Sequence, residues 1–339
     1  MSERQAGRNV RWLKWAAVCG VVFAAVVVVL LLPSRREPHL AQFRLQFGWI
    51  PDAHQAGFWV ALDKGFYKDA GLNVELIPGG IDSSPVKAAA SGAAEIGQAG
   101  GIEQVITAVS EGLPIRAVAA IHRDTPHALV STTESPIRRP EDLEGKTVAV
   151  AHGDAAEVLF DALMKRASIP RGSVKIVPFR FDLTPLMNGQ VDAVTGFSTD
   201  QPVTLEEKGF TPVILRYADY GVSSYGYTLL CSDHVLQTRG RDVAAFIAAS
   251  RKGWQYVFDH PDEAADILAR RAPGQLDSKI ERKKLDRIRP LMCEASSGVL
   301  ADWHLSRERI ERVEAILHER GQLKRLPSYD KVVALSARE

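Results

Sequence analysis

The hydrophobic and polar residues of this chain alternate between strand-like and helix-like stretches. Residues 44–50 (RLQFGWI) and 72–78 (LNVELIP) are typical of strands, and residues 55–64 between them place Phe58, Ala61 and Leu62 on one helical face. Helices are expected next at 83–92 and 102–112, and strands at 94–100 and 115–121. Strands and helices that alternate at this spacing predict a parallel sheet with helices on both faces.

The same alternation restarts near residue 145. Strands are expected at 145–153, 174–179 and 190–197, with a helix at 154–168 whose N-cap is Asp154. Extended runs at 121–136 and 213–232 are long enough to pass from one unit to the other, and the pattern from Asp242 onward is helical. We therefore expect an α/β protein of two lobes with a cleft between them. Lobe 1 is expected to comprise residues 42–123 and 225–335, and lobe 2 residues 124–224.

Composition agrees with two lobes that each have a core, since the 339 residues are 46% hydrophobic and 24% charged. One segment stands apart from this pattern. Trp15 to Leu32 is a run of 18 apolar or small residues, about long enough to span a bilayer. Basic residues at positions 4, 8, 11 and 14 precede it and favour a cytoplasmic location for residues 1–14. We expect a transmembrane anchor at 15–32 and a linker at 33–41; a cleaved signal is the alternative, disfavoured because no small-residue cleavage pattern follows.

Charge and cysteine content narrow the possible functions. Without residues 1–36 the chain has 36 basic and 40 acidic residues, and no basic patch is evident, which excludes a nucleic-acid-binding role. Cys231 and Cys293 lie in the exported part, and their positions leave open whether they form a disulfide or remain two buried thiols.

Several ordered segments together resemble a known family. They are GWIPDAHQAGFWVALDKGFYKDAGLNVEL, AAASGAAEIGQAGG, DLEGKTVAV, VDAVTGFSTDQP and HPDEAADILA, and the resemblance covers about residues 42 to 335. They resemble the periplasmic substrate-binding proteins of ABC importers, in the SsuA-like branch related to thiamine pyrimidine synthase. The resemblance implies a type II two-lobe binding-protein fold and a monomer. It also implies a permease and an ATPase as partners, at the periplasmic face of the inner membrane.

Ligands of such folds sit beyond the carboxyl ends of the parallel strands, near helix N-termini. Trp49 follows the first strand, so we expect its ring to form a wall of the ligand site rather than part of the core. Other strand ends and the returning crossover supply further candidates. The predicted ligand-binding residues are Trp49, Asp52, His54, Gln98, Gly100, Asp154, Phe181, Asp200 and Tyr225.

These residue types indicate the chemistry of the ligand. Asp52, Asp154 and Asp200 add negative charge to the cleft and disfavour an oxyanion such as a sulfonate or nitrate. Aromatic walls with carboxylates suit a flat heterocycle with N–H donors, such as a thiamine-pyrimidine precursor or a flavin-like ring. Histidines 54, 122, 127 and 152 match no metal-ligand spacing, so no metal and no cofactor are expected.

An enzyme is the first alternative. The fungal-type synthases of this family use a lysine that holds pyridoxal phosphate and a histidine four positions later. Aligned on that motif, this sequence has Ala99 in place of the lysine and Glu103 in place of the histidine. Since alanine forms no Schiff base, we expect no synthase activity. A second alternative is a sensing module that passes a signal rather than a substrate to its partner.

Overall fold

The computed structural model describes residues 40–334 apart from 81, 152–154 and 295. Within these residues no helix has both the length and the apolar character needed to cross a membrane. The predicted anchor, Trp15 to Leu32, lies outside the described residues and stays a prediction.

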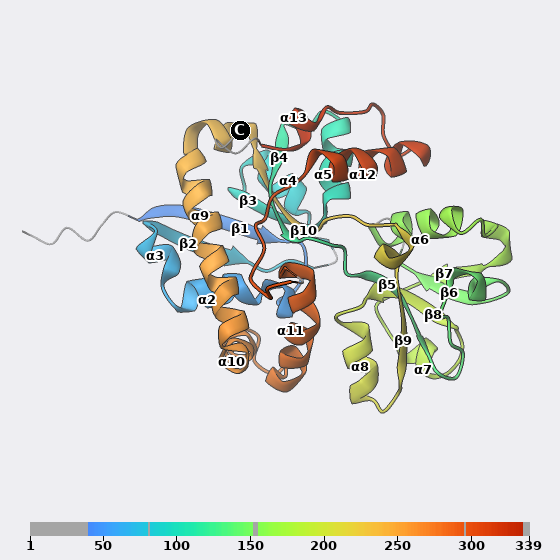
Figure 1. Cartoon of the computed structure of the whole chain (residues 1–339). Coiled ribbons are helices and arrows are strands. Elements are labelled where there is room, and N and C mark those ends of the chain that lie inside the picture. Colours follow the sequence, from blue (N-terminus) through green and yellow to red (C-terminus); the bar gives the residue numbers. More distant parts are fainter. Residues whose placement is uncertain (1–39, 81, 152–154, 295, 335–339) are drawn as a thin grey trace, which may run out of the picture. The chain divides into compact units, whose positions relative to one another are not determined.

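Two five-stranded sheets organise the chain into two lobes (Figure 1). The first sheet has the order β2-β1-β3-β10-β4, and the second has the order β7-β6-β8-β5-β9. The strands of the first sheet are β1 (Ala41–Phe47), β2 (Leu72–Ile77), β3 (Ile96–Gly101), β4 (Ile115–His122) and β10 (Gly226–Ser232). Those of the second are β5 (His127–Thr132), β6 (Thr147–Val150), β7 (Lys175–Pro178), β8 (Ala193–Phe197) and β9 (Pro212–Arg216). The predicted two-lobe α/β fold is confirmed, while the lobe boundaries at 123/124 and 224/225 stay a prediction.

The prediction of purely parallel sheets is wrong in one respect for each lobe. β10 runs antiparallel to both β3 and β4, and β5 runs antiparallel to both β8 and β9. Both strands lie in the extended runs that were expected only to pass between the lobes. Because each run enters its sheet from the side of the other lobe, its strand points against its neighbours.

Helices cover both sheets. The first lobe carries α2 (Ala56–Asp63), α3 (Phe66–Asp69), α4 (Pro85–Ser91), α5 (Ile102–Ser110), α9 (Asp233–Asp259), α10 (Pro261–Arg271), α11 (Ser278–Met292), α12 (Arg307–Glu319) and α13 (Tyr329–Val332). The second carries α6 (Ala155–Arg166), α7 (Thr184–Met187) and α8 (Gln201–Glu207). Short 3₁₀ helices are η1 (Ala53–Gln55), η2 (Pro140–Leu143), η3 (Arg171–Ser173) and η4 (Tyr217–Tyr220).

Local sequence signals set several of these ends. Ser84 caps α4 by accepting a hydrogen bond from the Lys87 amide at 3.3 Å, Pro85 occupies the first turn, and Gly92 ends the helix at φ 76°. β1 ends at Phe47 rather than at residue 50 as predicted. The loop that follows it therefore begins at Gly48.

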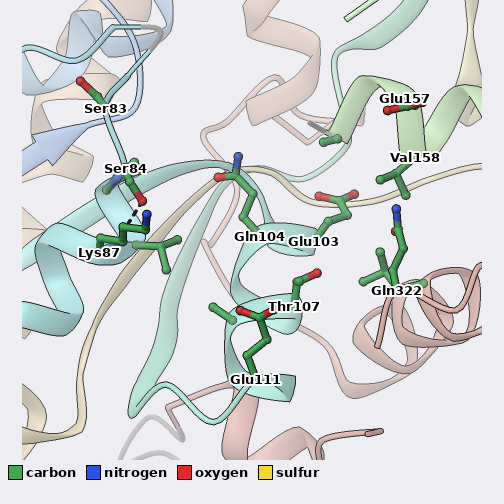
Figure 2. A pocket seen from close by; sticks show the side chains of 15 residues that line it. Ser83, Ser84, Lys87, Glu103, Gln104, Thr107, Glu111, Glu157, Val158 and Gln322 are labelled. Atoms are coloured by element: carbon green, nitrogen blue, oxygen red, sulfur yellow. Dashed lines mark hydrogen bonds between the residues drawn. The ribbon is translucent and has the colours of Figure 1, made fainter. Parts of the chain in front are cut away.

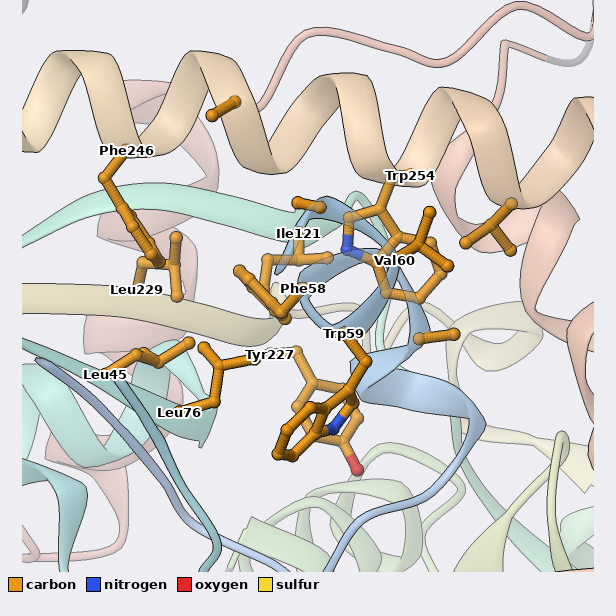
Figure 3. Close-up of a cluster of buried hydrophobic side chains, with 14 of the residues drawn as sticks. Leu45, Phe58, Trp59, Val60, Leu76, Ile121, Tyr227, Leu229, Phe246 and Trp254 are labelled. Atoms are coloured by element: carbon orange, nitrogen blue, oxygen red, sulfur yellow. The ribbon is translucent and has the colours of Figure 1, made fainter. Parts of the chain in front are cut away.

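The first lobe has a core on each face of its sheet. On one face Phe246 and Trp254 project from α9 toward the strands, as Figure 3 shows, and Trp254 is fully buried. The helices α2 and α9 cross closely, since a Cβ on Gly57 would lie 2.3 Å from the Trp254 ring. α9 therefore covers one face of the first lobe's sheet. Cys231 and Cys293 are free, buried thiols, and burial, with Asp233 nearby, raises the pKa of Cys231 to about 12.

Candidate functional site

The carboxyl end of β1 lies beside the middle of its parallel neighbour β3, which continues three residues further to Gly101. Phe47 pairs with Gln98 in the register, so the loop that starts at Gly48 begins beside Gln98. A Cβ on Gly48 would lie 3.1 Å from the Gln98 carbonyl oxygen and 3.5 Å from Cγ of Pro85. The end of β1, the middle of β3 and the start of α4 therefore meet at one edge of the sheet.

A cavity of about 610 Å³ lies beside this edge and is lined from both lobes (Figure 2). Ser84 and Lys87 at the start of α4 stand on one side, and Glu157 of α6, which belongs to the second lobe, stands on the other. Its remaining lining residues are Ser83, Pro85, Val86, Glu103, Gln104, Thr107, Ala108, Glu111, Ala155, Val158, Leu317 and Gln322. The volume lies in the range of sites for small organic ligands.

Carboxylates outnumber cations in the described lining of this cavity. Glu103, Glu111 and Glu157 line it together with Lys87, the one cationic side chain among the described lining residues. Glu111 and Glu157 each pair with a cation outside the lining, Lys324 at 3.8 Å and Arg171 at 3.6 Å. The Gly100 amide, close by, donates a hydrogen bond to Oε1 of Gln104 at 3.2 Å. Such a lining favours ligands that donate hydrogen bonds or carry positive charge over anions.

Trp49 and Phe181 join the lobes through their rings. Their ring centroids lie 5.1 Å apart at an interplanar angle of 48°. Phe181 is 49% exposed and adopts φ 60°, a conformation that costs a non-glycine residue about 1–2 kcal/mol. Trp49 is half-buried, and its carbonyl oxygen accepts hydrogen bonds from the Gly79 amide at 2.9 Å and from Gln55 Nε2 at 3.3 Å. Neither ring lines the cavity; instead each covers the other.

Gln98 is buried in the middle of β3 with unused hydrogen-bonding capacity. It is 1% exposed, and among the described residues neither its amide oxygen nor its amide nitrogen has a hydrogen-bond partner. Both ring nitrogens of His122, at the end of β4, are also buried and have no hydrogen-bond partner among the described residues. Because an unpaired buried polar group is costly, groups of this kind are typical of functional positions.

His54 connects η1 to the second lobe. Its Nε2 lies 3.1 Å from the Thr199 hydroxyl, which follows β8. The imidazole stacks on the Tyr227 ring at 4.8 Å and lies 5.2 Å from the His122 ring. Burial, and after it the positive charge of Lys284, lowers the pKa of His54 to about 3, so this imidazole is neutral near pH 7.

Asp52 and Asp200 belong to a charged group at the lobe boundary. Lys284 Nζ lies 2.7 Å from an Asp200 carboxylate oxygen and 2.9 Å from one of Glu281. The Asp52 carboxylate accepts a hydrogen bond from the His54 amide at 2.9 Å and so caps η1. Burial, followed by repulsion from Asp200 and Glu281, raises the pKa of Asp52 well above its usual value.

Tyr225 is placed differently from the other predicted residues. Tyr225 is 5% exposed, packs with the core under α5 and α12, and has its hydroxyl 3.3 Å from that of Ser306. Asp154 lies outside the described residues. The structure thus brings Trp49, Gln98 and Gly100 to one sheet edge and Phe181 against Trp49, whereas Asp52, His54 and Asp200 form part of the lobe contact.

Several cavity residues were missed by sequence reasoning. Glu157, Gln104 and Gln322 carry no motif. The start of α4 did carry a readable signal, since Ser84 and Pro85 mark a helix N-terminus. Among the described residues no group of three histidine, cysteine, aspartate or glutamate side chains is arranged to hold a metal ion.

Two α/β lobes with a cavity lined from both are the architecture of the periplasmic binding proteins, so the protein has the two-lobe fold of this class. The chain belongs to the NMT1/THI5-like family, whose model matches residues 52–264. It has a TM-score of 0.71 and 13% identity to the periplasmic aliphatic sulphonate binding protein SsuA from Escherichia coli, covering 88% of this chain and 93% of that one. At this identity the likeness shows the fold alone.

Curated relatives include binding proteins and synthases. The formylaminopyrimidine-binding protein of Halalkalibacterium halodurans is 28% identical over 68% of this chain and 70% of its own length. The riboflavin-binding protein RibY of Chloroflexus aurantiacus is 26% identical over 75% of this chain and 74% of its own. The 4-amino-5-hydroxymethyl-2-methylpyrimidine phosphate synthase of Legionella pneumophila is 24% identical over 76% of this chain and 82% of its own.

Proposed function

We propose that this protein is an extracytoplasmic substrate-binding protein that delivers a small aromatic heterocycle to an ABC importer. The observation that carries the proposal is the cavity lined from both lobes, with three glutamates and one lysine, in a chain of this family. A thiamine-pyrimidine precursor or a flavin-like ring supplies the N–H donors that such a lining accepts. Relatives named for binding formylaminopyrimidine and riboflavin support this ligand class.

We propose that Trp49 and Phe181 part to admit the ring of the ligand, and that Gln98 and Gly100 contact its polar edge. The ring pair and the unpartnered amide of Gln98 support these roles. The proposed site also includes Asp52, His54, Asp154, Asp200 and Tyr225. The periplasmic face of the inner membrane, with the segment at 15–32 as anchor, remains the proposed location.

Synthase activity is the second candidate, because some relatives are named for it. Ala99, at the aligned position of the cofactor lysine, is buried and has no amine. We therefore propose that the chain is not an enzyme of this kind. An anion binder is disfavoured by the glutamate-rich lining, whatever the fold of the sulphonate-binding neighbour.

The proposal is tested by purifying the full chain, denaturing it and identifying the released small molecules by mass spectrometry. Titration calorimetry then compares formylaminopyrimidine, riboflavin, taurine and nitrate. Binding of either heterocycle at micromolar concentration or below supports the proposal. Binding of taurine or nitrate alone contradicts it, and an absorbance band of a pyridoxal phosphate Schiff base would restore the synthase alternative.

A further inference from the structure

Two helices of the first lobe reach across to the second lobe with charged side chains. From α11, Lys284 pairs with Asp200 at 2.7 Å. From the end of α12, Arg320 pairs with Asp161 of α6 at 2.6 Å. Arg320 Nη1 also donates to two carbonyl oxygens in the first turn of α6, those of Glu157 at 3.0 Å and Val158 at 2.7 Å.

Burial of the cation separates these two contacts from the other ion pairs between the lobes in the described part of the chain. The side chains of Arg320 and Asp161 are each 19% exposed, and that of Lys284 is 12% exposed. By contrast, Lys165 and Glu319 are 65% and 59% exposed. Arg287 and Lys283 of α11 also pair with Glu206 and Glu207 of α8, with the arginine 30% and the lysine 54% exposed. Since exposure weakens an ion pair, Lys284 and Arg320, the more buried cations, are expected to contribute more per contact than these pairs do.

The Lys284 contact is linked to the loop that follows β1, and the Arg320 contact is linked to the first turn of α6, which lines the cavity. Glu281, which binds Lys284 at 2.9 Å, also accepts the Ala53 amide at 2.7 Å, four residues after Trp49. Burial alone would lower the pKa of Lys284, but Asp200 and Glu281 raise it above its usual value, so the ammonium stays charged. On the other side, the α6 turn held by Arg320 supplies the cavity residues Glu157 and Val158.

We propose that Lys284 and Arg320 are two inter-lobe clamps that hold the lobes closed around the cavity before any ligand binds. They act as positioning residues, since neither lines the cavity. Both lie beyond residue 264, where the match to the family model ends. Closure by the clamps does not depend on the ligand's identity. Its consequence, a higher affinity because the binding-competent state is more populated, rests on the proposed function.

The test measures the distance between the lobes in the ligand-free full chain by pulsed electron paramagnetic resonance. Spin labels are placed at Lys68→Cys in α3 and Lys175→Cys in β7, both exposed, in a Cys19→Ser background. Cys231 and Cys293 are buried and escape labelling. We expect one narrow distance distribution for the clamped protein and a broader, longer one for the Lys284→Met, Arg320→Met double variant.

Matched controls lie on the same two helices. Arg282 pairs with Asp262 and Asp286, and Arg312 pairs with Glu308, all within the first lobe. Arg282→Met and Arg312→Met are therefore expected to leave the distribution unchanged. Arg320→Lys retains the charge but not the forked contact to two carbonyls, and is expected to shift the distribution part of the way.

A second pair of variants guards against misfolding. Asp200→Asn and Asp161→Asn remove the partner carboxylates from the second lobe and are expected to give the same longer distances, with circular dichroism confirming the fold. The clamp proposal is overturned if these variants and the methionine variants superimpose on the native distribution. It is also overturned if the control variants broaden the distribution equally. Loss of heterocycle binding by Asp200→Asn without any change in distance would overturn the clamps and leave the proposed function standing, because Asp200 would then act in the binding site itself.

Discussion

At the scale of single residues, the two tryptophans Trp49 and Trp254 have contrasting environments. Trp254 is fully buried against α2, so Trp254→Ala is expected to lower the free energy of unfolding by about 3–5 kcal/mol. Trp49 is half-buried and rests on Phe181, so Trp49→Ala is expected to change stability little and to weaken heterocycle binding by about 2–4 kcal/mol. Thermal melting and a fluorescence titration with riboflavin measure both effects. Equal destabilisation by the two variants would make Trp49 a core residue.

Gln98 offers a second test at this scale. Its buried amide has no partner among the described residues, so Gln98→Met, of similar volume, is expected to stabilise the ligand-free protein by about 1–3 kcal/mol. The same variant is expected to bind the heterocycle less tightly, because it removes a donor and an acceptor. Urea unfolding and calorimetry provide the two values. A less stable variant would show that the native protein satisfies this amide by other means.

His127 predicts a pH effect. Burial lowers its pKa to about 3, and its Nδ1 lies 2.6 Å from the Thr125 hydroxyl. The unfolded chain binds this proton near pH 6.5, so the stability contributed by neutral His127 is complete above pH 6.5 and is lost as the pH falls toward 3. His54 and His122 act in the same direction, while the raised pKa values of Asp52 and Glu281 act in the opposite one.

His127→Gln isolates this contribution. Between pH 6.5 and 4.5 it is expected to lose about 2 kcal/mol less stability than the native protein, measured by urea unfolding at each pH. The exposed His234→Gln on α9 is the control and is expected to follow the native curve. Parallel curves for His127→Gln and the native protein would show that His127 is not held neutral by its surroundings.

At the scale of elements, the crossing of α2 and α9 depends on two glycines. A Cβ on Gly253 would lie 2.0 Å from the Gly57 carbonyl oxygen and 2.8 Å from Cβ of Ala61, so the helices cannot keep this distance with a side chain there. Gly253→Ala is expected to destabilise the protein by about 3 kcal/mol. Gly240→Ala, on the same helix with nothing within 4 Å, is expected to be neutral or stabilising by up to about 1 kcal/mol. If thermal melting ranks the two variants the other way, the close crossing is wrong.

At the scale of the whole molecule, the sequence of the N-terminal segment predicts attachment to the membrane. Trp15 to Leu32 lies outside the described residues, and its sequence predicts an uncleaved anchor. The protein is expected to stay with the membrane fraction after a salt wash and to be released by detergent. Residues 37–339 in the wash supernatant, with an N-terminus near Pro38, would establish a cleaved signal instead.

The sequence predicted the succession of elements because periodicity and caps are local properties. The strands expected at 44–50 and 72–78 and the helix expected at 83–92 all follow from neighbours within a few residues, and β1, β2 and α4 each occupy part of the corresponding stretch. The family resemblance likewise rests on ordered segments. The direction of β10 and β5 was missed, because it depends on which side of a sheet an incoming strand approaches, and no local pattern encodes that.

Part of the candidate site could likewise be predicted from the sequence, and part of it could not. Strand ends are readable from the sequence, so Trp49, Gln98 and Gly100 could be predicted to share an edge, as their parallel strands then required. Only the tertiary structure decided that Phe181 meets Trp49, that Asp200 binds Lys284 and that Arg320 reaches α6. These pairs join residues about 84 to 160 positions apart in the sequence. Whether these residues come into contact depends on how the two lobes pack against each other. The sequence around either residue does not encode that packing.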